Sequence, residues 1–370
     1  QGNNHVLSNI TIEYLGNRPD AGSAASGIFS RARNSSIRNL TIENISLTNT
    51  IAWPGQGSFP VNGALVGDDE GFTTFDAINV LGIDIDSNHY SGGLVGESQT
   101  FNAPSSYRNI VLEGEIDGPY AAGLIGSLVK YRAGATIDSV TINMDLNGNR
   151  ISGGLAGSMS ASMGADITVR NVSFEGSINA LHEQTVSGVG GAIGYVSGDV
   201  NIRNLAVRAS IVAASTEPSD DPRFESNVGG LIGWVDTAQL RIENAYFNGD
   251  IEVASANPNS DRSVSLLFGS LMDRKQTTTI DVINTYVNGT ILADSPQPYQ
   301  RGSLVGRLVT RDQFPEGEIE LTFTDTFAVD TYDLAGFSDR DIFGTRSQKS
   351  LSDLQDTSTY TNAGWDFALT

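Results

Sequence analysis

The chain has 370 residues, a formal net charge of −21, 41 glycines and no cysteine. The lack of cysteine excludes disulfides and thiolate metal sites. The acidic balance disfavours nucleic acid, whose phosphates need a basic surface, and it disfavours anionic membranes. No apolar run approaches the roughly 18 residues of a membrane span.

The first recurring motif is a glycine, two or three small or apolar residues, and a second glycine. Clear copies are Gly63-Ala-Leu-Val-Gly67 and Gly92-Gly-Leu-Val-Gly96. The closing glycines are Gly67, Gly96, Gly126, Gly157, Gly194, Gly233, Gly269 and Gly306. Glycine pairs of this kind permit a positive φ at a corner and a close approach between neighbouring backbone segments.

The second motif is an asparagine followed by an apolar, any and a second apolar residue. The best copies begin at Asn39, Asn109, Asn171, Asn204, Asn244 and Asn284. Further copies begin at Asn9 and Asn79, and Ser139 and Asp325 take the same place in two more. Asparagine tolerates left-handed backbone angles, and its amide can bond to the copies above and below. We therefore predict an asparagine ladder.

Each unit holds three short segments of period two, which is typical of strands. The chain is therefore predicted to be all-β, a right-handed parallel β-helix (β-solenoid) of about ten coils with three short strands per coil. This domain spans residues 1–344, and residues 345–370 form a small C-terminal cap. In the cap, Ser350 and Asp353 would open a short helix, while Trp365 and Phe367 would cover the last coil.

These residues resemble the GLUG repeat, named for its Gly-Leu-apolar-Gly core, of large bacterial surface and secreted proteins. The group includes adhesin-like chains and some secreted peptidases. The resemblance runs from roughly Gly27 to the C-terminus. It implies an extracellular β-helix, and it implies no catalytic residue, because the repeat is a scaffold. The peptidases are similar only in their repeats, since this chain has no His-Glu-x-x-His motif.

Insertions recur at one corner of the coil, between the asparagine strand and the next glycine strand. Loops at one corner of successive coils stack into one face, which is often the binding face. The candidate binding residues there are Trp53, Tyr90, Tyr120, Asp220, Asp221, Arg223 and Tyr299. The aromatic rings could stack on sugars. The alternative is that these side chains pack their own loops.

We predict an extracellular or cell-surface module that presents loops to a glycan or to a cell-surface or matrix protein, without binding nucleic acid or inserting into membranes. One alternative is a filament or matrix subunit that stacks end to end on copies of itself, since open strand edges template pairing. Another is a β-helix polysaccharide lyase or hydrolase, which would need carboxylates on neighbouring strands.

The outward column of the asparagine strand offers no such carboxylates. Its predicted members are Thr11, Thr41, Leu81, Val111, Thr141, Ser173, Ala206, Tyr246, Tyr286 and Phe327. His5, His89 and His182 lie near turns in different coils and are interpreted as solvated loop residues. The acidic run from Gly67 to Gly71 suits either a structural Ca²⁺ or a plain acidic turn. We expect no other cofactor, and no catalytic residue is assigned.

Overall fold

The computed structural model is all-β, and its strands pair in parallel. It describes residues 5–14, 25–49, 60–182, 188–215, 226–255, 262–273, 278–294, 300–310, 319–329 and 342–349. This part of the chain forms two sheets. The described residues include no helix long and apolar enough to cross a membrane.

The smaller sheet contains nine short strands, one from each of nine successive repeats. These are β2 (Ala25–Ser26), β5 (Val61–Gly63), β8 (Tyr90–Gly92), β11 (Tyr120–Ala122), β14 (Ile151–Gly153), β17 (Gly188–Gly190), β19 (Ser226–Gly229), β22 (Arg262–Ser265) and β26 (Gln300–Gly302).

The larger sheet has twenty strands. After each short strand comes a strand that follows the glycine motif: β3 (Phe29–Ala32), β6 (Val66–Asp69), β9 (Val95–Thr100), β12 (Ile125–Lys130), β15 (Ala156–Ala161), β23 (Phe268–Asp273) and β27 (Val305–Thr310). The asparagine strands are β1 (His5–Tyr14), β4 (Ser36–Asn49), β7 (Thr74–Ser87), β10 (Ser105–Asp117), β13 (Ala135–Gly148), β16 (Ile167–His182), β24 (Thr278–Asn288) with β25 (Ile291–Asp294), β28 (Ile319–Val329) and β29 (Ile342–Lys349). Two strands continue through both positions, β18 (Ile193–Ser215) and β20 (Ile232–Asn248), and β21 (Ile251–Ser255) extends the second.

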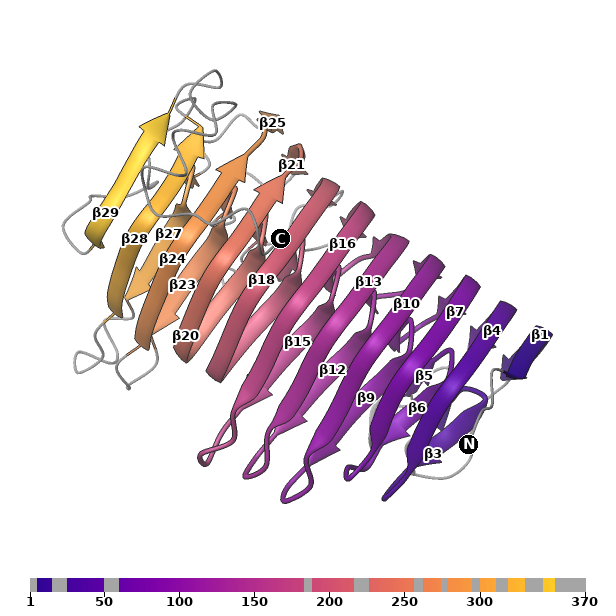
Figure 1. Ribbon diagram of the computed structural model, residues 1–370. Coiled ribbons are helices and arrows are strands. Elements are labelled where there is room, and N and C mark those ends of the chain that lie inside the picture. Colours follow the sequence, from indigo (N-terminus) through magenta and orange to yellow (C-terminus); the bar gives the residue numbers. More distant parts are fainter. Residues whose placement is uncertain are drawn as a thin grey trace.

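Each strand pairs with the equivalent strand of the repeat before and the repeat after it. Ile142 of β13, for example, lies between Leu112 of β10 and Phe174 of β16. Figure 1 shows the asparagine strands side by side in chain order along the long axis. Residues in the same place of successive repeats therefore form columns, and the inward columns join into one apolar core running from Ala32 to Ala328.

The closing glycines of the first motif form one of these columns. A methyl group added to any of them from Gly96 to Gly306 would lie 2.5–2.7 Å from the carbonyl oxygen of the preceding glycine in the column. The same methyl on Gly96 would lie 2.4 Å from the backbone nitrogen of Asn62 in the smaller sheet. The two sheets thus approach so closely here that no side chain fits.

The predicted positive φ at these glycines is wrong. None of the closing glycines has a φ in the left-handed region, which is instead occupied by other glycines such as Gly71 and Gly82. The motif needs glycine for the close backbone approach alone.

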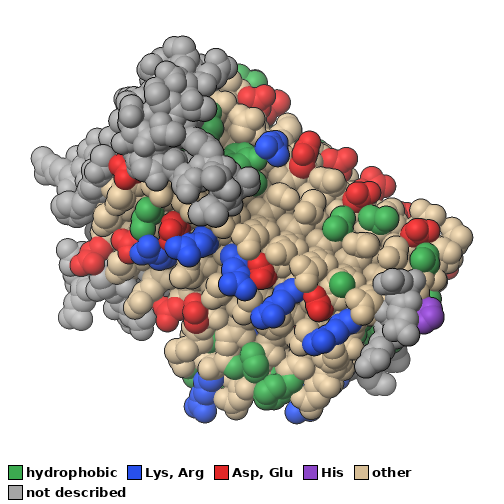
Figure 2. Space-filling model, viewed as in Figure 1, with side chains coloured by type: hydrophobic (Ala, Val, Ile, Leu, Met, Phe, Trp, Pro, Cys, Tyr) green, Lys and Arg blue, Asp and Glu red, His purple; other side chains and the backbone are tan. Residues whose placement is uncertain are grey.

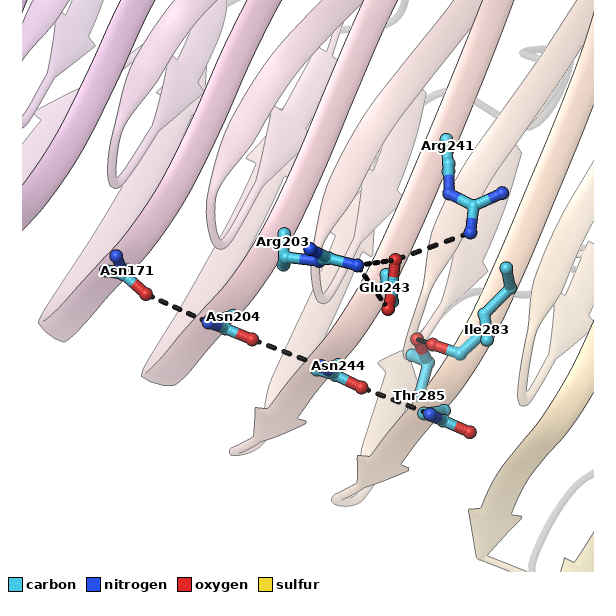
Figure 3. A network of polar contacts seen from close by, with 9 residues as sticks. Asn171, Arg203, Asn204, Arg241, Glu243, Asn244, Ile283 and Thr285 are labelled. Carbon is cyan, nitrogen blue, oxygen red and sulfur yellow. Dashed lines mark hydrogen bonds and ion pairs between the residues drawn. The ribbon is translucent and has the colours of Figure 1, made fainter. Parts of the chain in front are cut away.

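The left-handed residues of the second motif form another column. Asn39, Asn109, Asn171, Asn204, Asn244 and Asn284 all have φ between 48° and 56°. The Asn204 amide donates to Asn171 Oδ1 at 2.9 Å, and Asn244 and Asn284 continue the chain at 3.2 Å each (Figure 3). Where the preceding repeat has no asparagine, the amide bonds to an aspartate instead, as Asn171 does to Asp138 at 2.9 Å.

The first repeats depart from the predicted register. Ala77, not Asn79, has the left-handed angle in β7, and Asn9 bonds to Asn44 rather than lying beside Asn39. Each of these strands has a second left-handed residue, Asn44 in β4 and Gly82 in β7, and Gly82 is the extra residue of a bulge opposite β10. Because Ala77 lies beside Asn39, Thr41 pairs with Asn79 rather than Leu81. Because Asn9 lies beside Asn44, Thr11 pairs with Ser46.

Replacing Asn204 by alanine is expected to lower the free energy of unfolding by about 2–3 kcal/mol, because the two amide bonds are lost and alanine disfavours the left-handed region. Replacement by glycine, which accepts this φ, should cost only about 1 kcal/mol. Chemical denaturation of both variants measures the difference. Equal costs would show that the backbone angle contributes nothing.

The predicted boundary between residues 344 and 345 lies inside β29, which pairs with β28 as a further strand of the larger sheet. The predicted cap helix after Ser350, with Trp365 and Phe367, lies outside the described residues.

Candidate functional site

Two of the seven predicted binding residues belong to the described part of the chain. Tyr90 and Tyr120 begin β8 and β11 of the smaller sheet rather than standing in insertion loops. Their rings stack with centroids 4.1 Å apart, and Arg150 Nη1 donates to the Tyr120 hydroxyl at 3.3 Å. The rings therefore pack on each other. Trp53, Asp220, Asp221, Arg223 and Tyr299 lie outside the described residues.

A ladder of alternating charges runs along the outer side of the asparagine strands, one residue before the asparagine column. It consists of Arg38, Asp76, Arg108, Asp138, Arg170, Arg203 and Glu243. Arg170 bonds to Asp138 at 2.9 Å, and Arg203 bonds to both carboxylate oxygens of Glu243 at 2.8 Å. Figure 2 shows basic and acidic side chains alternating in a row across this face.

The ladder was not predicted from the sequence, although the charged residues that form it recur at one place in the repeat. A charged residue stands directly before every motif copy from Asn39 to Asn244 except Asn79, and its sign alternates over most of these copies. In that repeat Asp76 precedes Ala77 instead. Exposed pairs of this kind each add at most about 1 kcal/mol. The observed register places opposite charges on neighbouring strands at every step except Arg170 beside Arg203. A register shift would separate these opposite charges, so the ladder favours the observed register.

A polar groove of about 390 Å³ lies at the C-terminal end of this ladder, over β18, β20 and β24 and beside the start of β16. Its lining consists of Asp166, Asp199, Val200, Asn201, Gln239, Leu240, Arg241, Thr279 and Asp281. Two outward columns supply the polar groups, three and five residues before the asparagine column. Arg241 at its edge also contacts Glu243 of the ladder at 3.4 Å (Figure 3).

This groove can bind hydroxyl-rich ligands. Carboxylates accept hydrogen bonds, the guanidinium donates them, and the amides and the hydroxyl do both. The side chains stand on paired strands rather than on loops, so their spacing is fixed by the sheet. The predicted loop face and this groove share no residue.

A second cluster joins carboxylates of β6 and β9. Asp68 and Glu97 are direct partners across these parallel strands, and Arg31 lies 3.8 Å from Asp68 and 3.4 Å from Glu70. Burial, and next the Glu70 carboxylate, raise the pKa of Asp68 to about 6. Burial, and next Asp68, raise the pKa of Glu97 to about 7. A carboxyl group that keeps its proton near neutral pH can act as a general acid.

This pair predicts a stability that falls as pH rises. Both groups lose their protons near pH 4 in the unfolded chain but only near pH 6–7 in the folded one. Between these values the folded state binds more protons, so the free energy of unfolding decreases with pH. Glu97→Gln should flatten this dependence and gain on the order of 1 kcal/mol at pH 8. Denaturant midpoints from pH 4 to 8 test it, and an unchanged slope in the variant contradicts it.

The neighbouring carboxylate, Asp69, points into the core with Lys130, and both are 0% exposed. Asp69 Oδ2 accepts hydrogen bonds from Ser98 at 2.7 Å, Ser105 at 2.6 Å and Tyr107 at 2.7 Å. Lys130 Nζ donates to Ser98 at 2.8 Å and to Ser105 at 3.1 Å. The two serine hydroxyls therefore bridge the Lys130 ammonium and the Asp69 carboxylate. The network joins β6, β9, β10 and β12 of three successive repeats.

The electrostatics of this network favour the charged pair. Burial alone would raise the pKa of Asp69, but the Lys130 ammonium and the serine hydroxyls outweigh it and lower that pKa. Burial lowers the pKa of Lys130 to about 8, which keeps it largely protonated at neutral pH. In the acidic run from Gly67 to Gly71, Asp69 thus points into the core, whereas Asp68 and Glu70 are partly exposed on the other side. The three carboxylates do not converge on a common point where a Ca²⁺ could bind.

Within the described ranges, no three carboxylate or imidazole groups are placed to hold a metal ion. His5 is exposed, and the side chain of His182 lies outside the described residues. The interpretation of His89 as a solvated loop residue is wrong, because its side chain is buried between β7 and β8. Only two residues connect Ser87 of β7 to Tyr90 of β8, and His89 is 8% exposed there.

Comparison with known proteins gives no relative. The chain matches no protein-family model, no curated protein and no solved structure. The similarity to GLUG repeats stays a prediction from the motif residues.

Proposed function

We propose that the chain is a right-handed β-solenoid of GLUG-type repeats, an extracellular structural and adhesive module of a bacterial surface or secreted protein that presents one face to a glycan or a partner protein. The parallel register of equivalent strands, repeat after repeat, supports the solenoid. The net charge of −21 supports a protein held apart from its copies by self-repulsion.

The observation that carries the adhesive function is the polar groove beside the charge ladder. It is open to solvent, it contains donors and acceptors together, and its side chains stand on paired strands that keep one register from Asp199 onward. A surface of this kind binds by hydrogen bonds at fixed positions and needs no moving part.

A binding assay without turnover tests this function. The purified chain is applied to a glycan array and to bacterial and host-cell surfaces, and the same glycans are analysed for new reducing ends or unsaturated products. We expect saturable binding and no product. Absence of binding to every surface would rule the adhesive function out.

A polysaccharide hydrolase is a second candidate, and the Asp68–Glu97 pair is the specific observation in its favour. Two half-buried carboxyl groups on adjacent strands with raised pKa values can divide the roles of acid and base. Product release that is abolished in both Asp68→Asn and Glu97→Gln would establish this function. Binding without any product would exclude it.

End-to-end stacking is a third candidate. Among the described strands β1 pairs only with β4, and Val6 is 55% and Leu7 40% exposed on it. Such an edge favours a further parallel strand. Filaments that lengthen with protein concentration in negative-stain microscopy would support this function, and particles of one length at all concentrations would contradict it.

A further inference from the structure

The polar groove has a geometry that selects its ligand, and this inference rests on the proposed adhesive function. We propose that the groove binds an uncharged, extended polysaccharide chain that runs along the stacking direction, from the start of β16 across β18, β20 and β24. Three properties of the groove lead to this assignment: its charge, its repeat distance and its lack of large apolar contacts.

The charge of the groove excludes acidic ligands. Its lining includes the carboxylates of Asp199 and Asp281 and a third from Asp166, against the single guanidinium of Arg241. That guanidinium already shares its charge with Glu243. Uronate, sulfate and phosphate groups would therefore meet net negative charge, and each would have to lose water without gaining a counter-charge.

The same groups suit sugar hydroxyls. A hydroxyl donates one hydrogen bond and accepts others, so carboxylates, amides and a guanidinium can all pair with it. Asn201 and Gln239 supply amides, and Thr279 supplies a hydroxyl. A binding site of this composition rejects anionic ligands by its charge and selects among neutral ones by the positions of its donors and acceptors.

The repeat distance favours a polymer over a single sugar. Asp199, Gln239 and Thr279 are successive members of one column, and Asn201, Arg241 and Asp281 are successive members of the next. Neighbouring strands lie about 4.8 Å apart, which is close to the length of one hexopyranose residue in an extended chain. Each repeat of the protein can therefore place its polar side chains beside one sugar after another.

The groove also disfavours a protein partner. Val200 and Leu240 are its apolar lining residues, and both are almost fully buried in the core. Protein interfaces depend on buried aromatic and aliphatic anchors, for which this groove offers no pocket. A strand-like peptide would need an open sheet edge, whereas the groove lies on the face of paired strands.

The test is a titration with defined oligosaccharides. The intact chain is titrated with the neutral hexasaccharides of cellulose, laminarin, xylan, mannan and chitin, and with hexamers of galacturonate and of alginate. The groove variant is Gln239→Ala/Asp281→Ala. The matched control is Glu113→Ala/Glu115→Ala, which removes two exposed carboxylates of β10 outside the groove. Circular dichroism confirms that both variants fold.

We expect at least one neutral hexasaccharide to bind with little salt dependence, more tightly than its disaccharide. Each lost hydrogen bond should weaken binding about tenfold, so the groove variant should lose binding and the control should keep it. Binding only to acidic hexamers, or equal binding by the groove variant, overturns the assignment while leaving the adhesive function intact. No binding to any glycan, with binding to cells retained, also overturns it, and loss of both removes the adhesive function itself.

Discussion

Replacing Lys130 by methionine is expected to lower the free energy of unfolding by about 3–5 kcal/mol, because Asp69 would keep its charge in the core without a counter-charge. The ammonium is bound to Ser98 and Ser105, and the same serines donate to the carboxylate. Removing the ammonium leaves the serines bonded to Asp69 but removes the positive charge that lowers its pKa.

The double variant Asp69→Asn/Lys130→Met separates the charge from the packing. A neutral amide can still accept from the serines, and no charge is left in the core, so most of the lost stability should return. Arg108→Met, at an exposed position of the charge ladder, is the control and should cost less than about 1 kcal/mol. Denaturant midpoints give the energies.

Stacked repeats can unfold in parts, so a single midpoint can hide a local effect. Hydrogen exchange should show lost protection in β6, β9 and β12, which the network joins, and unchanged protection in β20 and β24. A Lys130→Met variant that is as stable as the parent, or one that is destabilised evenly along the chain, would falsify the idea that this network holds the first repeats together.

The buried network shows where sequence reasoning stopped short. Lys130 stands two residues after Leu128, and Thr100 stands two residues after Ser98. Since side chains alternate along a strand, the sequence alone places all four on the same face of the sheet. The acidic run was interpreted as one unit, although alternation separates Asp69 from Asp68 and Glu70. The fold brings residues from three repeats to one point, and their distance along the sequence follows no local pattern that could predict it.

The columns were easier to predict than the site. A residue repeated in every unit falls into one column whenever equivalent strands pair, which is why the glycine and asparagine columns follow from the motifs. The register failed in the first repeats for two reasons. In β7 the left-handed position is held by Ala77, which no motif marks, and in β4 the second left-handed residue, Asn44, offers Asn9 another partner than Asn39.

The groove was missed for a related reason. The outward position two residues after each asparagine, where an active-site carboxylate would be expected, carries small, apolar and aromatic side chains. The charged and amide side chains stand one, three and five residues before it, as Arg203, Asn201 and Asp199 do before Asn204. They vary from repeat to repeat, so no motif marks them. Their proximity becomes visible only once the strands are aligned.

Adding a methyl group at Gly154 should have the second large effect, a loss of about 3 kcal/mol in the free energy of unfolding. The methyl carbon would lie 2.3 Å from the carbonyl oxygen of Gly191 and 2.3 Å from Cγ of Phe174. Phe174 is only 1% exposed and cannot turn outward, and the carbonyl belongs to a paired backbone. Both contacts must be relieved by separating two repeats, which breaks strand pairing on either side.

Gly164→Ala is the matched comparison. Nothing lies within 4 Å of the methyl group added there, and only the backbone angle, φ 80°, opposes it. It should therefore cost about 1 kcal/mol and leave exchange in β14 and β17 unchanged, whereas Gly154→Ala should expose both strands. If both variants lose the same free energy of unfolding, the short distance between repeats is not the reason why the motif requires glycine. The recurrence of glycine would then reflect a requirement of the folding process rather than of packing in the native structure.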